Sequence, residues 1–397
     1  MCGYNFFMNK LRLALFFGGR STEHEVSVIS ALQAYKNLNQ DKYEITAVYV
    51  SKDGDFYTNP KFLDLKNFKE IDTLLLSSAR VTFGRKGPQG GIIKDGLLSN
   101  KFSPVDVALP IFHGAFGEDG CIQGLFEIYQ IPYVGFNVTG SAVGMDKAVA
   151  KALFLSMGLP VGRYTEIKRI DWIKNPKKCL QEAKSKLKFP LFIKPATTGS
   201  TIGVNKAVDI DMLQFGIEVA TCYSEKILIE EAFQNVIEVN CSALGYEEVK
   251  ASVCEMPVAS GDILSYDDKY IKGNAKGSKS AGMASLSRVI PAPISEKLTK
   301  QIQETTIRVF KAIDGCGVAR IDYFVDKKRE KFWINEINTI PGSLSFYLWE
   351  KSGIKYSELL DIVIKAAIKR AENQKKTQYT FNSPLLSQMA QVGGIKR

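Results

Sequence analysis

The stretch FWINEINTIPG, residues 332–342, places acidic and amide side chains within an apolar strand pattern. Side chains alternate across a strand, so Glu336 and Asn338 share one face, with Cα atoms roughly 6.7 Å apart at about 3.3 Å per residue. A carboxylate turned toward the packed side of a sheet is costly unless its charge is compensated, and a hard cation such as Mg²⁺ is one compensation. A solvent-facing edge of the sheet is the alternative.

The preceding strand, GVARIDYFVD at residues 317–326, predicts partners for these two side chains. Only KKRE separates the strands, so we expect an antiparallel β-hairpin that brings Asp322 near Glu336. Arg320 shares a face with Asp322 by the same alternation, whereas a register slip of one residue would send Asp322 to the other face. Oxygen ligands select Mg²⁺ or Mn²⁺ over zinc, and a carboxylate between two ions about 3.5–4 Å apart is typical of phosphate-handling sites. A structural ion pair is the other interpretation.

The composition of the chain excludes several classes of protein. The net charge is +10, but no basic stripe is interleaved with aromatic residues, so we expect no nucleic-acid partner. No apolar run reaches the length of a membrane span, so we expect no membrane segment and a cytoplasmic protein. The 7 cysteines lack C-x-x-C spacing and there are only 2 histidines, which argues against a zinc site or a disulfide framework.

The first part of the chain predicts an α/β domain over residues 1–138, built on a parallel sheet. Its opening reads as strand, glycine-containing turn, helix and strand; the segments are LALFFGG, VSVISALQAYKNL and YEITAVYVS. Two further strands with a helix between them are expected in VDVALPIFHG, IQGLFEIYQ and IPYVGF.

Two more α/β units and a tail follow. We expect a central domain over 139–229, which starts with one helical stretch at 141–158 and ends in the strand EKILIEEAF. A C-terminal domain over 230–378 contains a helix from about 294 to 313 and the hairpin described above. Residues 379–397 show no strong periodicity, which indicates a loosely attached tail.

A loop in the central domain has the composition of a phosphate cover. Lys194 ends the apolar strand KFPLFIKP, and the loop ATTGSTIGV that follows could place backbone N–H groups over phosphates. The lysine precedes the glycines, so this is not a Walker A loop. An ordinary turn is the alternative.

Two loops of the first domain each follow a predicted strand, at the edge where open parallel sheets bind ligands. In the first loop Glu23 would offer a carboxylate to a substrate amine. In the second, His113 would offer a hydrogen bond or a positive charge to a carboxylate, with a hydrogen-bonded structural histidine as the alternative. Glu118 lies in the same loop, and for it a turn or N-cap residue is the alternative to a binding role.

Together these segments resemble the D-alanine–D-alanine ligases of the ATP-grasp superfamily, over residues 11 to about 370. The motifs are GGRSTEHEVS, HGAFGEDG, MDKAVAK, KPATTGSTIGV, YDDKY, ARIDYF and EINTIPG, in the family's order. The resemblance implies a three-domain ATP-grasp fold with ATP between the central and C-terminal domains. It implies that the first D-alanine's carboxylate takes the γ-phosphate of ATP and that the second D-alanine's amine attacks the acyl phosphate, for peptidoglycan precursor synthesis.

The resemblance also assigns roles to individual residues. The ATP contacts it implies are Lys147, Lys194, Glu230, Glu238 and Lys269. The ligands of two Mg²⁺ or Mn²⁺ ions are Asp322, Glu336 and Asn338. Arg320 and the N–H of Gly342 would stabilise the tetrahedral oxyanion. The first substrate's ammonium would meet Glu23, Ser200 and Tyr270, and its carboxylate would lie near His113.

Three departures from the family's pattern bear on the acceptor. The turn after Gly342 reads SLSFYLWEKSG, which is shorter than usual and lacks the Ser-x-x-Pro element, so Ser345 is the nearest match to the serine that binds the second substrate. Thr197 and Thr198 stand where many members have an arginine. The segment after Tyr270 is longer and more basic than the usual lid. The sequence leaves open a D-alanyl-D-serine enzyme, another carboxylate–amine ligase of this superfamily and a non-catalytic nucleotide-binding relative.

The glycine- and lysine-rich segment 271–288 is expected to form a mobile lid over ATP and the substrates, because it contains almost no large apolar residue. A surface loop without a catalytic part is the alternative. The sequence does not fix the oligomeric state, and a homodimer is one state open to the chain.

Overall fold

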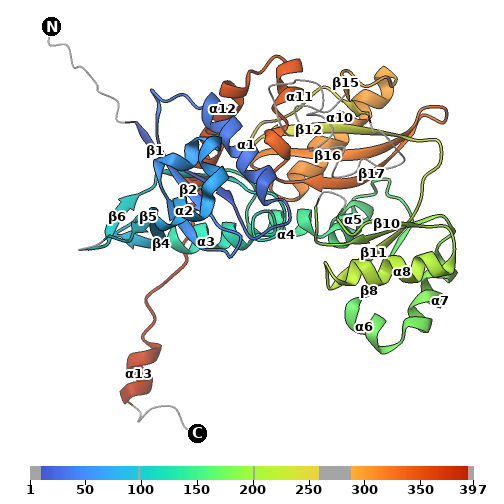
Figure 1. Ribbon diagram of the computed structural model, residues 1–397, viewed down its shortest axis with the longest axis horizontal. Helices are drawn as coiled ribbons and strands as arrows, with labels where there is room; N and C mark the ends of the chain where they lie inside the picture. Colours follow the sequence, from blue (N-terminus) through green and yellow to red (C-terminus); the bar gives the residue numbers. More distant parts are fainter. Residues whose placement is uncertain (1–9, 97–98, 200–201, 259–287, 392–397) are drawn as a thin grey trace.

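The computed structural model, shown in Figure 1, describes residues 10–96, 99–199, 202–258 and 288–391. Three expected site residues, Ser200, Lys269 and Tyr270, lie outside this part of the chain, as does the expected lid apart from Arg288. The described residues form three main sheets, one for each predicted unit. No described helix is long and apolar enough to span a bilayer.

The N-terminal unit confirms the predicted parallel core. β1 (Leu11–Gly18) pairs in parallel with β2 (Tyr43–Val50) on one side and with β7 (Val107–Ile111) on the other. β1 is an almost unbroken apolar run because helices and loops bury both of its faces, as is usual for parallel strands. The connecting helix is α1 (His24–Asn37), and α3 (Cys121–Tyr129) follows β7.

The same sheet is larger than the sequence indicated. Four antiparallel strands extend it in the order β6-β5-β4-β3-β2-β1-β7; they are β3 (Phe56–Thr58), β4 (Ala79–Lys86), β5 (Gln89–Lys94) and β6 (Lys101–Pro104). Three short helices lie between β3 and β4: η1 (Pro60–Leu63), η2 (Leu65–Glu70) and α2 (Ile71–Leu76). The prediction of a strand in IPYVGF is wrong, because that segment forms only one isolated β-bridge, between Tyr133 and Ala108.

The central unit is a four-stranded sheet in the order β10-β9-β11-β8. Its strands are β8 (Tyr164–Lys168), β9 (Leu191–Pro195), β10 (Asn205–Ala207) and β11 (Lys226–Glu231). Its helices are α6 (Arg169–Lys174), α7 (Pro176–Lys186) and α8 (Ile210–Thr221). Glu230 and Glu231 still pair with β9, so the predicted division at 229/230 falls inside β11, and the two sheets separate only after Glu231.

The helical stretch predicted at 141–158 is two helices. α4 (Val138–Met145) ends at Asp146, and α5 (Lys147–Ser156) begins there. The break follows from the side chain of Asp146, which accepts hydrogen bonds from the N–H groups of Ala148 and Val149 and so caps a new helix.

The C-terminal unit has the sheet order β13-β12-β16-β17. Its strands are β12 (Ile237–Gly245), β13 (Val249–Ala251), β16 (Gly317–Asp326) and β17 (Lys331–Asn338), beside a small pair of β14 (Met256–Pro257) and β15 (Arg288–Val289). Its helices are α10 (Glu296–Ala312), η5 (Gly342–Ser345), α11 (Phe346–Lys351) and α12 (Tyr356–Gln374).

The helix α12 packs the C-terminal unit against the N-terminal unit. α12 packs on α1 and β7, and Leu359, Leu360, Val363 and Ile364 share one core with Leu13, Leu15 and Phe17 of β1. Lys42 also contacts Asp361. In Figure 1 α12 lies against the N-terminal unit, whereas α13 (Leu385–Gln391), which has no buried residue, stands apart from the body.

Candidate active site

The hairpin of β16 and β17 brings the predicted polar residues together. Asp322 is paired with Glu336, as the sequence predicted, and Arg320 is paired with Asn338. A β-bulge accompanies this arrangement, because Tyr323 pairs with Ile334 and leaves Asn335 unmatched. The bulge changes the phase of β17, so that Ile334 and Ile337 both enter the core while Glu336 faces away from it.

Within this polar face, Arg320 and Asp322 form a buried pair. Arg320 Nε and Nη2 donate to Asp322 Oδ1 and Oδ2 at 2.6 and 2.7 Å, and Asn338 Nδ2 donates to Oδ2 at 3.1 Å. Burial opposes the charge on Arg320, but Asp322 outweighs burial and raises the pKa of the guanidinium. The structural ion pair considered from the sequence is therefore present. Because each carboxylate oxygen has more than one lone pair, the pair does not exhaust the acceptors of Asp322.

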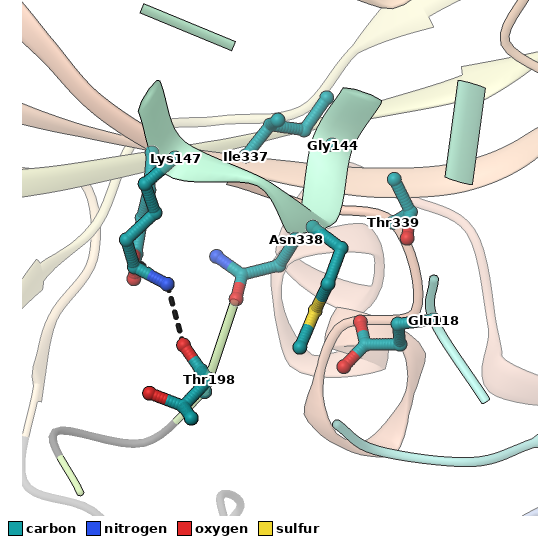
Figure 2. Close-up of a pocket in the computed structure, with 10 residues that line it drawn as sticks. Glu118, Gly144, Lys147, Thr198, Ile337, Asn338 and Thr339 are labelled. Carbon is teal, nitrogen blue, oxygen red and sulfur yellow. Dashed lines mark hydrogen bonds and ion pairs between the residues drawn. The ribbon is translucent and has the colours of Figure 1, made fainter. Parts of the chain in front are cut away.

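A pocket opens beside Glu336 and Asn338 (Figure 2). It lies where the junction of α4 and α5, the loop after β9 and the end of β17 meet; its lining residues are Glu118, Gly144, Met145, Lys147, Thr198, Gly199, Glu336, Ile337, Asn338 and Thr339. Lys147 Nζ donates to Thr198 O at 2.6 Å and lies 3.4 Å from Glu336 Oε2. The predicted loop, lysine and acidic strand therefore surround one space.

A second group of charges lies beside the pocket, around Glu230. Lys194 Nζ is 2.6 Å from Glu230 Oε2, and Lys151 Nζ is 2.7 Å from Glu230 Oε1. Burial would raise the pKa of Glu230, but the two lysines outweigh it and lower this pKa to about 2. Burial opposes the charge on Lys194, but Glu230, with smaller contributions from Glu336 and Glu238, outweighs burial and raises the pKa of Lys194. The sequence prediction missed Lys151, although its place one helical turn after Lys147 puts both lysines on one side of α5.

Glu23 is buried against the loop whose N–H groups were expected to cover phosphates. A Cβ atom added to Gly199 would lie 2.3 Å from Glu23 Oε2, and one added to Gly114 would lie 3.0 Å from the same oxygen. The backbone at both glycines therefore approaches the carboxylate closely. The expected neighbour Ser200 follows Gly199 directly but lies outside the described residues.

Glu118 joins the N-terminal unit to the end of β17. Its Oε2 accepts from Gly114 N at 2.8 Å, and its Oε1 accepts from Ile340 N at 3.0 Å. Burial, with a contribution from Glu23, raises the pKa of Glu118 to about 8. The sequence considered only a turn or N-cap role for Glu118, because its partner at Ile340 is distant in the chain.

His113 is a hydrogen-bonded residue of the interior. Its Nδ1 lies 3.1 Å from Ile340 O, and its Nε2 lies 3.1 Å from Ser30 Oγ. The carbonyl can only accept, so Nδ1 donates and Nε2 accepts from the hydroxyl. Burial lowers the pKa of His113 to about 4. A neutral His113 with two hydrogen bonds fits the structural alternative, and its predicted place near the carboxylate of the first substrate stays a prediction.

His113 should accordingly stay neutral across the range in which most histidines titrate. The two histidines of the chain can be followed by ¹H–¹³C NMR, with His113→Gln giving the assignment. We expect a midpoint for His113 near pH 4, and loss of stability as pH falls from about 6.5 toward that value, because only the unfolded state takes up the proton there. A midpoint near 6.5 would contradict this arrangement.

The turn after β17 has an unusual backbone. Ser343, Leu344 and Ser345 have φ values of 51°, 54° and 49°, three consecutive residues in the left-handed region. Ser343 Oγ donates to Gln33 Oε1 of α1 at 2.6 Å, which holds the turn against the N-terminal unit. Ser345, the candidate for binding the second substrate, is fully buried, and its Oγ has no hydrogen-bond partner among the described residues. Gly342 begins this turn.

Two family profiles match most of the chain. The profile described as "D-ala D-ala ligase N-terminus" matches residues 12–136, and "D-ala D-ala ligase C-terminus" matches residues 153–365. The chain belongs to the D-alanine–D-alanine ligase family.

Relatives within this family align with nearly the whole chain. The D-alanine–D-alanine ligase of Bacillus cytotoxicus is 37% identical over 94% of this chain and 100% of its own, and that of Chloroherpeton thalassium is 38% identical over 93% and 99%. Among solved structures, the D-alanine-D-alanine ligase of Coxiella burnetii has a TM-score of 0.76 at 28% identity, covering 92% of this chain and 96% of its own. The ATP-grasp architecture expected for a D-alanine–D-alanine ligase is confirmed.

One solved relative carries another name. The VanG D-Ala:D-Ser ligase of Enterococcus faecalis has a TM-score of 0.76 at 29% identity, and the alignment covers 90% of this chain and 100% of that one. The fold of the D-alanine–D-alanine ligase family therefore accommodates enzymes named for different acceptors.

Proposed function

We propose that this protein joins two D-alanine molecules into D-alanyl-D-alanine, with ATP forming an acyl phosphate on the first of them, as a step toward peptidoglycan in the cytoplasm. The observation that carries the proposal is the convergence of Lys147, Glu336 and Asn338 on one pocket beside the Arg320–Asp322 pair. Transfer of a phosphoryl group to a carboxylate brings two anions together, and this pocket offers a lysine and oxygen donors that suit such a step.

The donor set of this face fits divalent ions. Asp322, Glu336 and Asn338 supply only oxygens, the ligand type that Mg²⁺ and Mn²⁺ prefer. Among the described residues no group of three or more His, Cys, Asp and Glu side chains is placed to hold a metal, so the amide of Asn338 is part of the proposed set. Two bound ions would neutralise the phosphate oxygens of ATP.

The remaining side chains act on the organic substrates. Lys147 and Lys194 would contact the phosphates of ATP, and Glu230 and Glu238 would contact the nucleoside. Arg320 and the N–H of Gly342 would stabilise the oxyanion formed when the second amine attacks. Glu23, buried beside Gly199, would bind the ammonium of the first D-alanine.

The proposal is tested by incubating the protein with radiolabelled D-alanine, ATP and Mg²⁺. We expect labelled dipeptide and phosphate in equal amounts. Phosphate release without any dipeptide would contradict the ligase assignment.

Glu23→Gln should raise the KM for the first D-alanine by about 10- to 100-fold, the scale of a charged hydrogen bond, and change kcat much less. Initial rates measured at varied D-alanine and saturating ATP give both constants. An equal fall in kcat with KM unchanged would mean that Glu23 acts in the chemical step instead.

D-serine is the second acceptor candidate. The VanG enzyme is named for it, and the turn at Ser343–Ser345 differs from the family's pattern at the place expected to bind the second substrate. A competition assay with labelled D-alanine and unlabelled D-serine separates the two, because a preferred D-serine acceptor would yield mainly the mixed dipeptide.

A further inference from the structure

The charge cluster around Glu230 contains one more cation than its carboxylate requires. Lys151 and Lys194 each approach one oxygen of Glu230, at 2.7 and 2.6 Å. At contact distance two ammonium groups therefore meet one carboxylate, while Glu336 and Glu238 also act on Lys194 electrostatically.

The two lysines are not equivalent. The side chain of Lys151 is only 2% exposed, and its Nζ also donates to the backbone carbonyl of the bulge residue Asn335 at 3.0 Å. The side chain of Lys194 is 14% exposed, and its second contact is a weaker one at 3.3 Å with the amide oxygen of Asn335. Lys151 is therefore the more enclosed of the two lysines, and Lys194 is the one nearer to solvent.

Movement of Lys194 would matter energetically because Glu230 is buried. A buried carboxylate that loses its only partner is strongly destabilised, whereas a carboxylate that keeps one well-placed lysine is not. Lys151 provides that remaining partner, since its two contacts do not involve any group at the mouth of the pocket.

We propose that Lys151 is a positioning residue for nucleotide binding, the permanent counter-ion of Glu230, which allows Lys194 to leave Glu230 and neutralise the phosphates of ATP. This rests on the proposed function, because it assumes that ATP binds beside Lys194. Lys151 itself touches neither ATP nor the amino acids.

The ratio of the Kd values for ATP and adenosine tests the proposal, because only ATP has phosphates that require Lys194 to move. In Lys151→Met, Lys194 must stay with Glu230, so the Kd for ATP should rise on the order of 10²-fold, the scale of leaving one buried charge unpaired. The Kd for adenosine should change little. Both constants are measured by calorimetry on the full chain with Mg²⁺ and without D-alanine.

Two further variants make the result specific. In the double variant Lys151→Met/Glu230→Gln no carboxylate holds Lys194, so the ratio should return toward that of the wild type. Lys226→Met is the matched control, because Lys226 Nζ lies 2.6 Å from Asp146 Oδ2 at the start of the same helix, and its loss should leave the ratio unchanged.

The proposal is overturned if Lys151→Met weakens ATP and adenosine equally, or if the double variant does not recover. If Lys151→Met does not fold, the ratio of the Kd values for ATP and adenosine is compared between Glu230→Gln and the double variant. Equal ratios in these two variants support the counter-ion role, and unequal ratios overturn it. A wild type that binds ATP but forms no dipeptide contradicts the proposed function alone, and one that binds no ATP contradicts both.

Discussion

Arg320→Ala should lower kcat by about 10²- to 10³-fold, the usual effect of removing one donor to a developing oxyanion. It should also destabilise the fold by about 3–5 kcal/mol, because Asp322 would remain buried without its partner. The two effects are separated by measuring kcat per folded molecule at a temperature well below the melting transition and by measuring the free energy of unfolding in urea.

Arg370 offers a matched control for the Arg320 experiment. It is as buried as Arg320, but its Nη2 donates to the Tyr133 carbonyl at 2.7 Å, away from the pocket. Arg370→Ala should therefore cost stability while leaving kcat of the folded enzyme near the wild-type value. A loss confined to KM in Arg320→Ala would contradict the oxyanion role, because it would indicate binding of the ground state.

Glu336→Gln should nearly abolish turnover while the fold remains intact. Replacing a residue that hydrogen-bonds to a metal ligand typically lowers activity by about 10- to 100-fold, and replacing a direct carboxylate ligand should lower it further. Glu336 is also the partner of Lys147, at 3.4 Å, so its neutralisation removes charge from the centre of the pocket. Activity measured as a function of Mg²⁺ concentration should show a higher requirement for the ion.

The control for Glu336 is Asp326→Asn in the same hairpin. Asp326 is also a largely buried carboxylate, but it accepts hydrogen bonds from Lys328 N and Arg329 N in the turn. This variant should keep the wild-type dependence on Mg²⁺. Glu336→Gln with near wild-type activity at limiting Mg²⁺ would show that the proposed ligand set is wrong.

The sequence predicted those parts of the molecule that follow from local periodicity. The apolar run of β1 was sufficient for the parallel core, and the alternation in β16 and β17 was sufficient for the faces that Arg320 shares with Asp322 and Glu336 shares with Asn338. The bulge at Asn335 was not predictable, because one extra residue leaves no mark on composition. A strict alternation would have put Glu336 on the face of Ile334, in the core.

Contacts between segments that are distant in the chain could not be predicted from the sequence either. Glu118 meets Ile340 through a backbone N–H, and His113 meets the carbonyl of the same residue, so neither contact depends on the identity of the partner. Lys151 carried a periodicity signal, but its partner Glu230 lies on another element. The roles of individual site residues therefore remain predictions for the experiments above.

The core shared by β1 and α12 has a consequence for synthesis of the chain. Leu13, Leu15 and Phe17 are synthesised more than 300 residues before Leu359, Leu360 and Val363. Until α12 leaves the ribosome, one face of the first sheet lacks its cover, and exposed apolar surface of this kind promotes aggregation. The nascent N-terminal domain should therefore need protection from aggregation until α12 is made, and a premature stop before residue 356 would release that domain without the helix that completes its core.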